Sequence, residues 1–142
     1  MFLKNISIIY RHSAMILQKE LKEPPLNNTE QSILLFLNHN NGVNQNAIAV
    51  SFQFNKTTVT KTLALLEDFG LIRRETNCVS KREKCVFLTE EGRKVLIPIQ
   101  AIRNAYEEKL LEDFTEEERQ IFDQLSEKIA SKAWALNHQT VK

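Results

Sequence analysis

Cysteine is scarce in this chain, because only Cys78 and Cys85 occur among its 142 residues. Two cysteines are too few for a disulfide scaffold, and a reducing compartment would keep them as thiols, so packing must stabilise the fold. The two cysteines flank a polar segment and could approach each other across a hairpin. A redox switch is one interpretation of this pair, but we favour the packing of small apolar side chains.

Long uninterrupted apolar runs are also missing. No run reaches the roughly 18 residues of a membrane-spanning helix, and the first residues lack the basic-then-apolar order of a secretion signal. We therefore expect a cytoplasmic protein that does not contact a membrane. The length and the 42% share of hydrophobic residues fit one globular domain with a single core.

Motifs for catalysis and for metal binding are absent from the sequence. There is no Gly-rich phosphate loop, no nucleophile motif and no carboxylate pair in a recognisable frame. The three histidines, His12, His39 and His138, lack the spacing of metal ligands. We expect no enzyme activity, no cofactor and no metal site.

An excess of charge of one sign is lacking, since 19 basic residues stand against 18 acidic ones. The charges are unevenly distributed, however. Residues 54–85 contain seven bases and four acids, whereas residues 107–119 contain two bases and seven acids. This asymmetry predicts that the middle of the chain binds a polyanion and that the acidic C-terminal part faces elsewhere.

Apolar residues recur at helical spacing in six segments, and five of these segments follow a residue suited to cap a helix N-terminus. The predicted caps are Asn27, Asn44, Asn55, Thr89 and Thr115. Gly70 is placed to end the fourth helix in a left-handed conformation. Two short runs, 71–75 and 85–88, are compatible with strands joined by a basic loop. The sequence predicts a mainly helical fold with a small β-hairpin.

The order helix, turn, helix, strand, basic loop, strand between residues 44 and 88 indicates a winged helix-turn-helix. In the helix predicted after Asn55, Val59, Leu63 and Leu66 share one face and should be buried. The opposite face is short, polar and basic, as a helix that enters the major groove of DNA requires. The predicted reading residues are Asn55, Lys56, Thr57, Thr58, Thr60 and Lys61. The predicted contacts of the hairpin and its flank are Arg73, Arg74, Lys81, Arg82 and Lys84.

Two other interpretations of this polar face remain open. For an isolated helix, the solvated face of a surface helix would be the better interpretation, but the surrounding order of elements favours DNA binding. The serious alternative is a winged helix that acts as a protein-interaction module without sequence-specific DNA binding. Such a module would more often carry apolar or aromatic residues on the outward face. Thr57, Thr60 and Lys61 favour DNA.

Four stretches together resemble the MarR family of transcriptional regulators. They are Ala47-Ile48-Ala49, Asn55 to Lys61, Leu65 to Arg74, and Leu88-Thr89-Glu90-Glu91-Gly92-Arg93. The resemblance covers nearly the whole chain and implies one MarR-type domain over residues 1–142. Residues 27–88 would form the winged helix-turn-helix, and residues 1–23 and 89–142 would form dimerisation helices.

The resemblance also implies roles for the hairpin and for the helices outside it. An Asp-x-Arg motif of the family supplies an Arg to the minor groove, and it matches Ser80-Lys81-Arg82, where Arg82 is kept and Ser80 replaces the Asp. A homodimer would place two reading helices on a pseudo-palindromic site in double-stranded DNA, as for a ligand-responsive repressor. Apolar residues of the terminal helices are expected at the dimer interface: Phe2, Ile6, Ile9, Ile121, Phe122, Leu125 and Trp134.

Members of the family often bind small aromatic ligands. The resemblance therefore implies a small aromatic ligand as a candidate partner, in a cleft that Tyr10, His12, Phe36 and residues near Pro98 could line. Ordinary core packing explains the same residues equally well.

Overall fold

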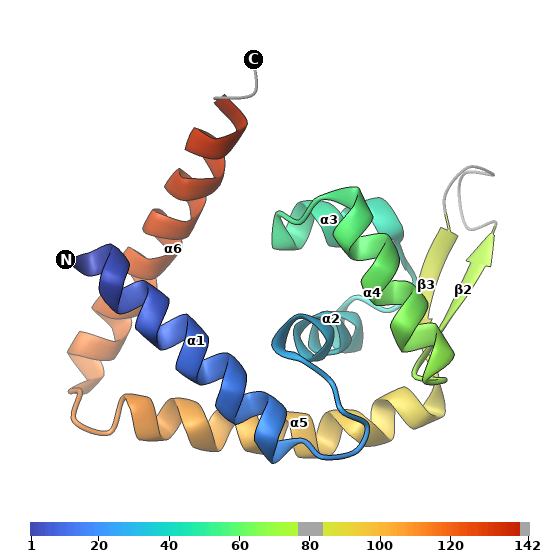
Figure 1. Ribbon diagram of the computed structural model, residues 1–142, viewed down its shortest axis with the longest axis horizontal. Coiled ribbons are helices and arrows are strands. Elements are labelled where there is room, and N and C mark those ends of the chain that lie inside the picture. The colour runs from blue at the N-terminus through green and yellow to red at the C-terminus, as the bar shows by residue number, and fades with distance from the viewer. Residues whose placement is uncertain (77–83, 140–142) are drawn as a thin grey trace. The chain divides into compact units, whose positions relative to one another are not determined.

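The computed structural model describes residues 1–76 and 84–139, which form six helices and three short strands (Figure 1). The strands form one antiparallel sheet in the order β1-β3-β2. The predicted mainly helical fold with a small wing is confirmed. The elements are α1 (Phe2–Glu20), α2 (Asn28–His39), β1 (Val43–Asn44), α3 (Gln45–Phe52), α4 (Lys56–Asp68), β2 (Ile72–Thr76), β3 (Lys84–Leu88), α5 (Glu90–Leu110) and α6 (Glu116–Gln139).

Side-chain caps begin the helices at the predicted positions. The Asn27 side chain accepts the Glu30 N–H at 2.9 Å, and the Glu30 carboxylate accepts the Asn27 N–H at 2.7 Å, which completes a capping box. The Asn44 and Asn55 side chains cap α3 and α4 by accepting the N–H groups of Ala47 and Thr58, each across 2.7 Å. Thr89 then caps α5 by accepting the Gly92 N–H. Each cap satisfies a backbone donor that the helix itself leaves unpaired.

The end of α4 is equally well defined. Gly70 has a φ of +74°, the left-handed conformation that glycine adopts at little cost. Its N–H donates to the Glu67 carbonyl at 2.9 Å, and the Leu71 N–H donates to the Leu66 carbonyl at 3.0 Å. These two bonds form a Schellman motif, which turns the chain directly into β2. The predicted glycine cap is confirmed.

The sheet has a third strand that the sequence did not indicate. β1 contains only Val43 and Asn44, which pair with Val86 and Cys85 of β3. Two residues are too few to show an alternating pattern, and their partners lie about forty positions further along the chain. The expected hairpin is therefore the larger part of a three-stranded sheet, in which β1 ties the start of α3 to the wing.

The hydrophobic core lies between the helix-turn-helix and the sheet. Val59, Leu63 and Leu66 of α4 are at most 1% exposed, so the face predicted to be buried is confirmed. They share one cluster with residues of the neighbouring elements, namely Leu34, Leu37, Ile48, Leu71, Ile72, Val86, Leu88, Leu96 and Ile99. Burial of apolar area at about 25 cal/mol per Å² is the main term that stabilises such a cluster. Packing thereby fixes the orientation of α4.

A fully buried amide connects three segments around α2. The Gln31 side chain is 0% exposed, and its Nε2 donates to the carbonyls of Leu17 and Leu26 at 3.3 and 3.0 Å. Its Oε1 accepts from Arg103 of α5 at 3.5 Å, and Arg103 also donates to the Asn28 side chain at 2.8 Å. A buried polar group is stabilising only when it is hydrogen-bonded. Gln31 thus joins α1, α2 and α5 through satisfied bonds.

The chain divides into two compact units, residues 1–104 and 105–142. The first contains the core, the sheet and the helices as far as most of α5, and the second contains the end of α5 and all of α6. In the second unit, Arg119 donates to the Glu108 carboxylate at 3.0 Å and to the Leu111 carbonyl at 2.9 Å. The expected assignment of residues 1–23, 27–88 and 89–142 to one domain stays a prediction. No helix within the described ranges is both long and apolar enough to cross a bilayer.

Candidate nucleic-acid interface

The turn between α3 and α4 is held by its backbone and by aromatic packing. Gln53 adopts a left-handed φ of +56°, and the Phe54 N–H donates to the Ala49 carbonyl at 3.0 Å. The Phe52 and Phe54 rings stack with centroids 5.4 Å apart, and Phe36 of α2 meets Phe52 edge to face. These contacts are worth up to about 1.5 kcal/mol per aromatic pair beyond burial. They fix the angle at which the chain enters α4.

The N-terminal part of α4 presents the predicted polar face to solvent. Five of the six predicted reading residues are exposed, while Thr58 is half-buried. Lys56 and Lys61 form no salt bridge with any other residue that the structure describes. The exposed five are Asn55, Lys56, Thr57, Thr60 and Lys61. This half of the helix therefore offers unpaired positive charge and hydroxyl groups to an external partner.

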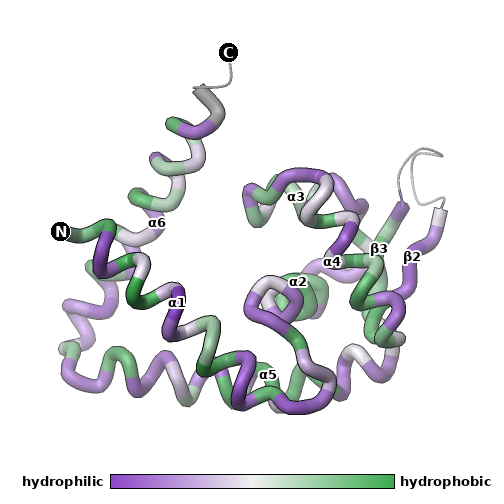
Figure 2. Tube along the Cα trace, in the orientation of Figure 1, coloured by the Kyte–Doolittle hydropathy of each residue, from purple (hydrophilic) through white to green (hydrophobic). Residues whose placement is uncertain are grey.

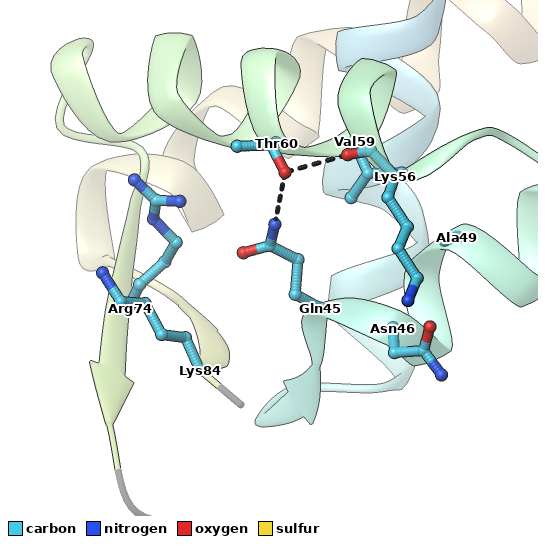
Figure 3. Close-up of a pocket in the computed structure, with 8 residues that line it drawn as sticks. All are labelled: Gln45, Asn46, Ala49, Lys56, Val59, Thr60, Arg74 and Lys84. Carbon is cyan, nitrogen blue, oxygen red and sulfur yellow. Dashed lines mark hydrogen bonds between the residues drawn. The ribbon is translucent and has the colours of Figure 1, made fainter. Parts of the chain in front are cut away.

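A hollow of about 420 Å³ opens beside this half of α4 (Figure 3). Three cationic side chains from three elements surround it, namely Lys56, Arg74 and Lys84. Its other lining residues are Gln45, Asn46, Ala49, Val59 and Thr60. Cations held around a concave surface create a positive potential that attracts phosphate groups. The N-terminus of α4 adds its partial positive charge to this potential.

Arg74 at this hollow is held by an acidic residue of α4. Its guanidinium donates to the Glu67 carboxylate at 3.0 and 3.4 Å, and its backbone N–H donates to the same carboxylate at 3.2 Å. These hydrogen bonds hold the pKa of Glu67 below its ordinary value of 4.5, against the opposing effect of partial burial. Arg74 therefore connects β2 to α4 while it lines the hollow.

Arg73, the neighbouring predicted contact, points to the other face of the strand. It forms an ion pair with Glu75, and its guanidinium carbon lies 4.5 Å from the centre of the Phe87 ring. Successive side chains of a strand alternate between its faces, so Arg73 and Arg74 cannot share one surface. The structure separates two residues that the sequence had grouped, and their contacts with DNA stay a prediction.

The wing loop itself lies outside the described residues. Lys81 and Arg82, which the sequence predicted as wing contacts, and Ser80, which replaces the family's Asp, all belong to this segment. Lys84 is the first residue of β3 and is exposed beside the hollow. Of the two cysteines, Cys78 also lies outside the described residues. Cys85 is 2% exposed and disulfide-bonded, so the structure contradicts the expectation that it stays a thiol.

Apolar residues recur along α1 and, in the second unit, along α6 (Figure 2). Several of their side chains are exposed. On α1, Phe2, Ile6 and Ile9 are between 44% and 56% exposed. On α6, the predicted interface residues Ile121, Phe122 and Leu125 are also between 44% and 56% exposed. The fourth predicted residue of α6, Trp134, is 40% exposed. Large exposed apolar faces of this kind mark interaction surfaces.

The residues that could line a ligand cleft differ in their exposure to solvent. Tyr10 is 64% exposed on α1, and His12 is also exposed. Phe36 instead packs at the edge of the core and against Phe52. A cleft for a small aromatic ligand stays a prediction.

Gln45 is a residue of this surface that the sequence did not indicate. It is the first residue of α3, and its Nε2 donates to the Thr60 hydroxyl of α4 at 2.9 Å (Figure 3). The Thr60 hydroxyl in turn donates to the Lys56 carbonyl at 2.8 Å. A glutamine one position after a cap is an ordinary helix residue in the sequence. Only the packing of α3 against α4 brings its amide to the reading face.

Comparison with known proteins shows the family to which the chain belongs. The MarR family model matches residues 26–84, from the loop before α2 to the start of β3. The transcriptional regulator HosA of Escherichia coli O127:H6 is 32% identical over 106 residues, which cover 75% of this chain and 78% of HosA.

Two solved structures show the same fold. The transcriptional regulator SlyA is 28% identical, with a TM-score of 0.85 over 95% of this chain and 97% of that one. The S. aureus MepR protein, in a structure described as a MepR–DNA complex, is 24% identical, with a TM-score of 0.84 over 94% of this chain and 96% of that one. With its helix-turn-helix, wing sheet and exposed polar α4, this chain belongs to the MarR family of DNA-binding transcriptional regulators, which are not enzymes.

Proposed function

We propose that this regulator reads a specific double-stranded DNA sequence by placing the N-terminal half of α4 in the major groove. The observation that carries the proposal is the contrast on α4 between a fully buried apolar face and an exposed polar face with unpaired lysines. Hydroxyl, methyl and ammonium groups on a narrow helix match the pattern of base edges in that groove. Lys56, Arg74 and Lys84 would hold phosphates beside the helix, since phosphate contacts position a protein on DNA.

Arg82 would complete the contact from the wing. The proposal assigns it to the minor groove next to the site that α4 reads, where arginine is attracted to narrow A·T segments. An Arg82→Ala variant should weaken binding to a specific duplex by about 1–3 kcal/mol. Equal affinity of the variant and the wild type would remove the wing from the proposal. Lys81→Ala, the adjacent loop cation, is the matched control for a general loss of charge.

We further propose that the protein acts as a homodimer on a pseudo-palindromic operator. The exposed apolar faces of α1 and α6 support this, because a second copy would bury them. Two-fold symmetry would then present two α4 helices about one DNA turn apart. The relative MepR, which has the same fold, has been solved in complex with DNA, and we extend DNA binding by this fold to the present chain.

The dimer is tested on the full chain by placing a charge in one exposed apolar face. Leu125→Lys on α6 should yield a monomer in sedimentation experiments and weaken binding to a palindromic duplex more than to a half-site. Gln124→Lys is the matched control, because it adds the same charge one position away from the apolar face. A Leu125→Lys protein that stays a dimer would exclude this face of α6 from the interface.

Repression and response to a small aromatic ligand are the regulatory part of the proposal. A dimer bound over a promoter would exclude the polymerase, and a ligand that favours another arrangement of the reading helices would release it. We propose that such a regulator acts in the cytoplasm, together with the DNA that it binds. Membership of the MarR family supports this part of the proposed function.

Selection from a random pool of duplexes is the experiment that tests the proposed function. Purified protein should enrich a pseudo-palindrome, and salicylate, chosen as a simple aromatic probe, or an oxidant can then be added to the same assay. If the selected duplexes share no sequence while the protein is folded, sequence-specific reading is wrong. The protein-interaction module would then become the better interpretation.

A further inference from the structure

The four threonines of α4 differ in what their hydroxyl groups are already bonded to. The Thr60 hydroxyl donates its proton to the Lys56 carbonyl and accepts a hydrogen bond from Gln45. Thr62 donates to the Thr58 carbonyl at 2.8 Å. Within the described parts of the chain, the hydroxyls of Thr57 and Thr58 have no hydrogen-bond partner. Threonines that look equivalent in the sequence therefore present different chemistry.

A hydroxyl group has one proton and two lone pairs. At Thr60 the proton and one lone pair are committed within the protein, across 2.8 and 2.9 Å. Rotating the Gln45 amide by half a turn would put its oxygen against the hydroxyl and would again keep the proton inside the protein. Thr60 consequently has no proton for an acceptor on DNA. What it offers to a partner is its methyl group and one remaining lone pair.

The two hydrogen bonds of the Thr60 hydroxyl, to the Lys56 carbonyl and from the Gln45 amide, also fix the direction of the Thr60 side chain. Threonine in a helix chooses between two rotamers, and the bond to the carbonyl four residues earlier selects one of them. The second bond, from Gln45, ties this rotamer to α3 (Figure 3). The methyl carbon is attached to the same β-carbon and therefore points away from the two hydrogen-bond partners of the hydroxyl. Thr60 is exposed and lines the hollow beside α4.

We infer that Thr60 reads the C5-methyl group of a thymine through its own methyl group, and that Gln45 is the positioning residue that enforces this. In the major groove only thymine carries a methyl group, and threonine methyl groups contact it through apolar surfaces. Guanine O6 and N7 and thymine O4 are acceptors that would need the committed proton. The inference rests on the proposed reading of DNA by α4. It adds to that proposal the base feature that Thr60 recognises, the thymine methyl group, and the residue that positions Thr60 for it, Gln45.

Uracil substitution is the direct test, because it removes only the methyl group from thymine. The probes are duplexes that the protein selects from a random pool, with each thymine replaced by uracil in turn. For the wild type, at least one position should lose about fourfold in affinity, the equivalent of one buried methyl group. Thr60→Ser keeps the hydroxyl and loses the methyl, so it should bind the thymine and uracil duplexes equally at that position.

Three further variants separate the reading of the methyl group from helix stability. Thr60→Val keeps a methyl group and loses the hydroxyl, so it should still prefer thymine over uracil. Gln45→Leu removes the bond from α3 and leaves the Thr60 hydroxyl held by the Lys56 carbonyl alone, so it should reduce the preference without a matching loss of overall affinity. Thr62→Ser is the matched control, since it loses the same methyl group beside the same backward hydrogen bond on a half-buried side chain.

Each result decides between the alternatives. A uracil effect that persists in Thr60→Ser would overturn the inference, as would the absence of any uracil-sensitive position in the wild type. Loss of sequence preference in Thr60→Val but not in Thr60→Ser would assign the reading to the hydroxyl and also overturn it. Failure to select any sequence from the pool would instead refute the proposed function on which the inference rests. Thermal unfolding of each variant verifies that it is folded.

Discussion

The two halves of α4 are built for different purposes. The half from Lys56 to Lys61 has a capped start, exposed hydroxyls and lysines without ion-pair partners among the described residues. The half from Thr62 to Asp68 is anchored by two buried leucines, by the Glu67–Arg74 ion pair and by the Gly70 turn. One helix thus combines a half that is packed into the core with a half whose polar groups are available to a binding partner. The difference teaches that the binding half can stay polar because the other half supplies the stability.

The largest expected effect comes from weakening the attached half. Leu66 is fully buried, so Leu66→Ala should lower the free energy of unfolding by about 2–5 kcal/mol through lost burial and the cavity that remains. Leu65 is the matched control, because it is adjacent, of the same type and 38% exposed. Leu65→Ala should cost less than about 1 kcal/mol. Urea unfolding measures both, and equal losses would contradict the assignment of the two halves.

A second change acts on the start of the binding half. Asn55→Ala removes the acceptor for the Thr58 N–H and should cost about 1 kcal/mol of stability. Asn55→Asp keeps the cap but adds a negative charge beside the proposed phosphate site. We expect Asn55→Asp to be as stable as the wild type and to bind duplex DNA more weakly. Normal DNA affinity in Asn55→Asp would place the phosphates away from this end of α4.

A third change removes charge from the binding half without touching the core. Lys56→Ala should reduce the slope of log affinity against log salt concentration by about one, since one counterion fewer is released from DNA. The loss of affinity caused by the substitution should therefore be about tenfold larger at 0.1 M salt than at 1 M. Lys19→Ala, an exposed lysine in the last turn of α1, is the control and should leave the slope unchanged. An unchanged slope in Lys56→Ala would remove this residue from the phosphate contacts.

The smallest expected effect concerns the ion pair that links α4 to β2. Folding lowers the pKa of Glu67, so its contribution to stability is complete above the unfolded value near 4.5 and is lost as the pH falls through the lower folded value. Because Glu67 is 40% exposed, the contribution should stay below about 1 kcal/mol. The difference in unfolding free energy between wild type and Glu67→Gln should shrink as the pH falls from 7 to 3.

The same variant asks whether Arg74 has a second role. With its carboxylate partner neutralised, Arg74 keeps its charge and becomes available to phosphates. Glu67→Gln should therefore bind duplex DNA a few-fold more tightly at pH 7, as measured by fluorescence anisotropy. Arg74→Lys distinguishes the roles further, because lysine keeps the charge but loses the paired hydrogen bonds. If affinity is the same in Glu67→Gln, Arg74 is a structural residue alone.

Local chemistry explains why much of the fold was predictable. The caps at Asn27, Asn44, Asn55 and Thr89 are each completed within three residues, and Gly70 acts within its own turn. The buried face of α4 follows from spacing alone. By contrast, β1 gains its identity only from pairing with β3, about forty residues away. The division of Arg73 and Arg74 between two surfaces likewise required the strand to be placed.

The sequence by itself determined where helices begin and end, which face of α4 is buried and which residues near it carry charge. These properties depend on neighbours within a few positions along the chain, so they can be inferred without tertiary contacts. Only the tertiary structure decided which polar groups are already satisfied. Gln45 meets Thr60 and Glu67 meets Arg74 because packing brings separate elements within hydrogen-bond distance. The groups left over after that pairing are the ones available to bind DNA.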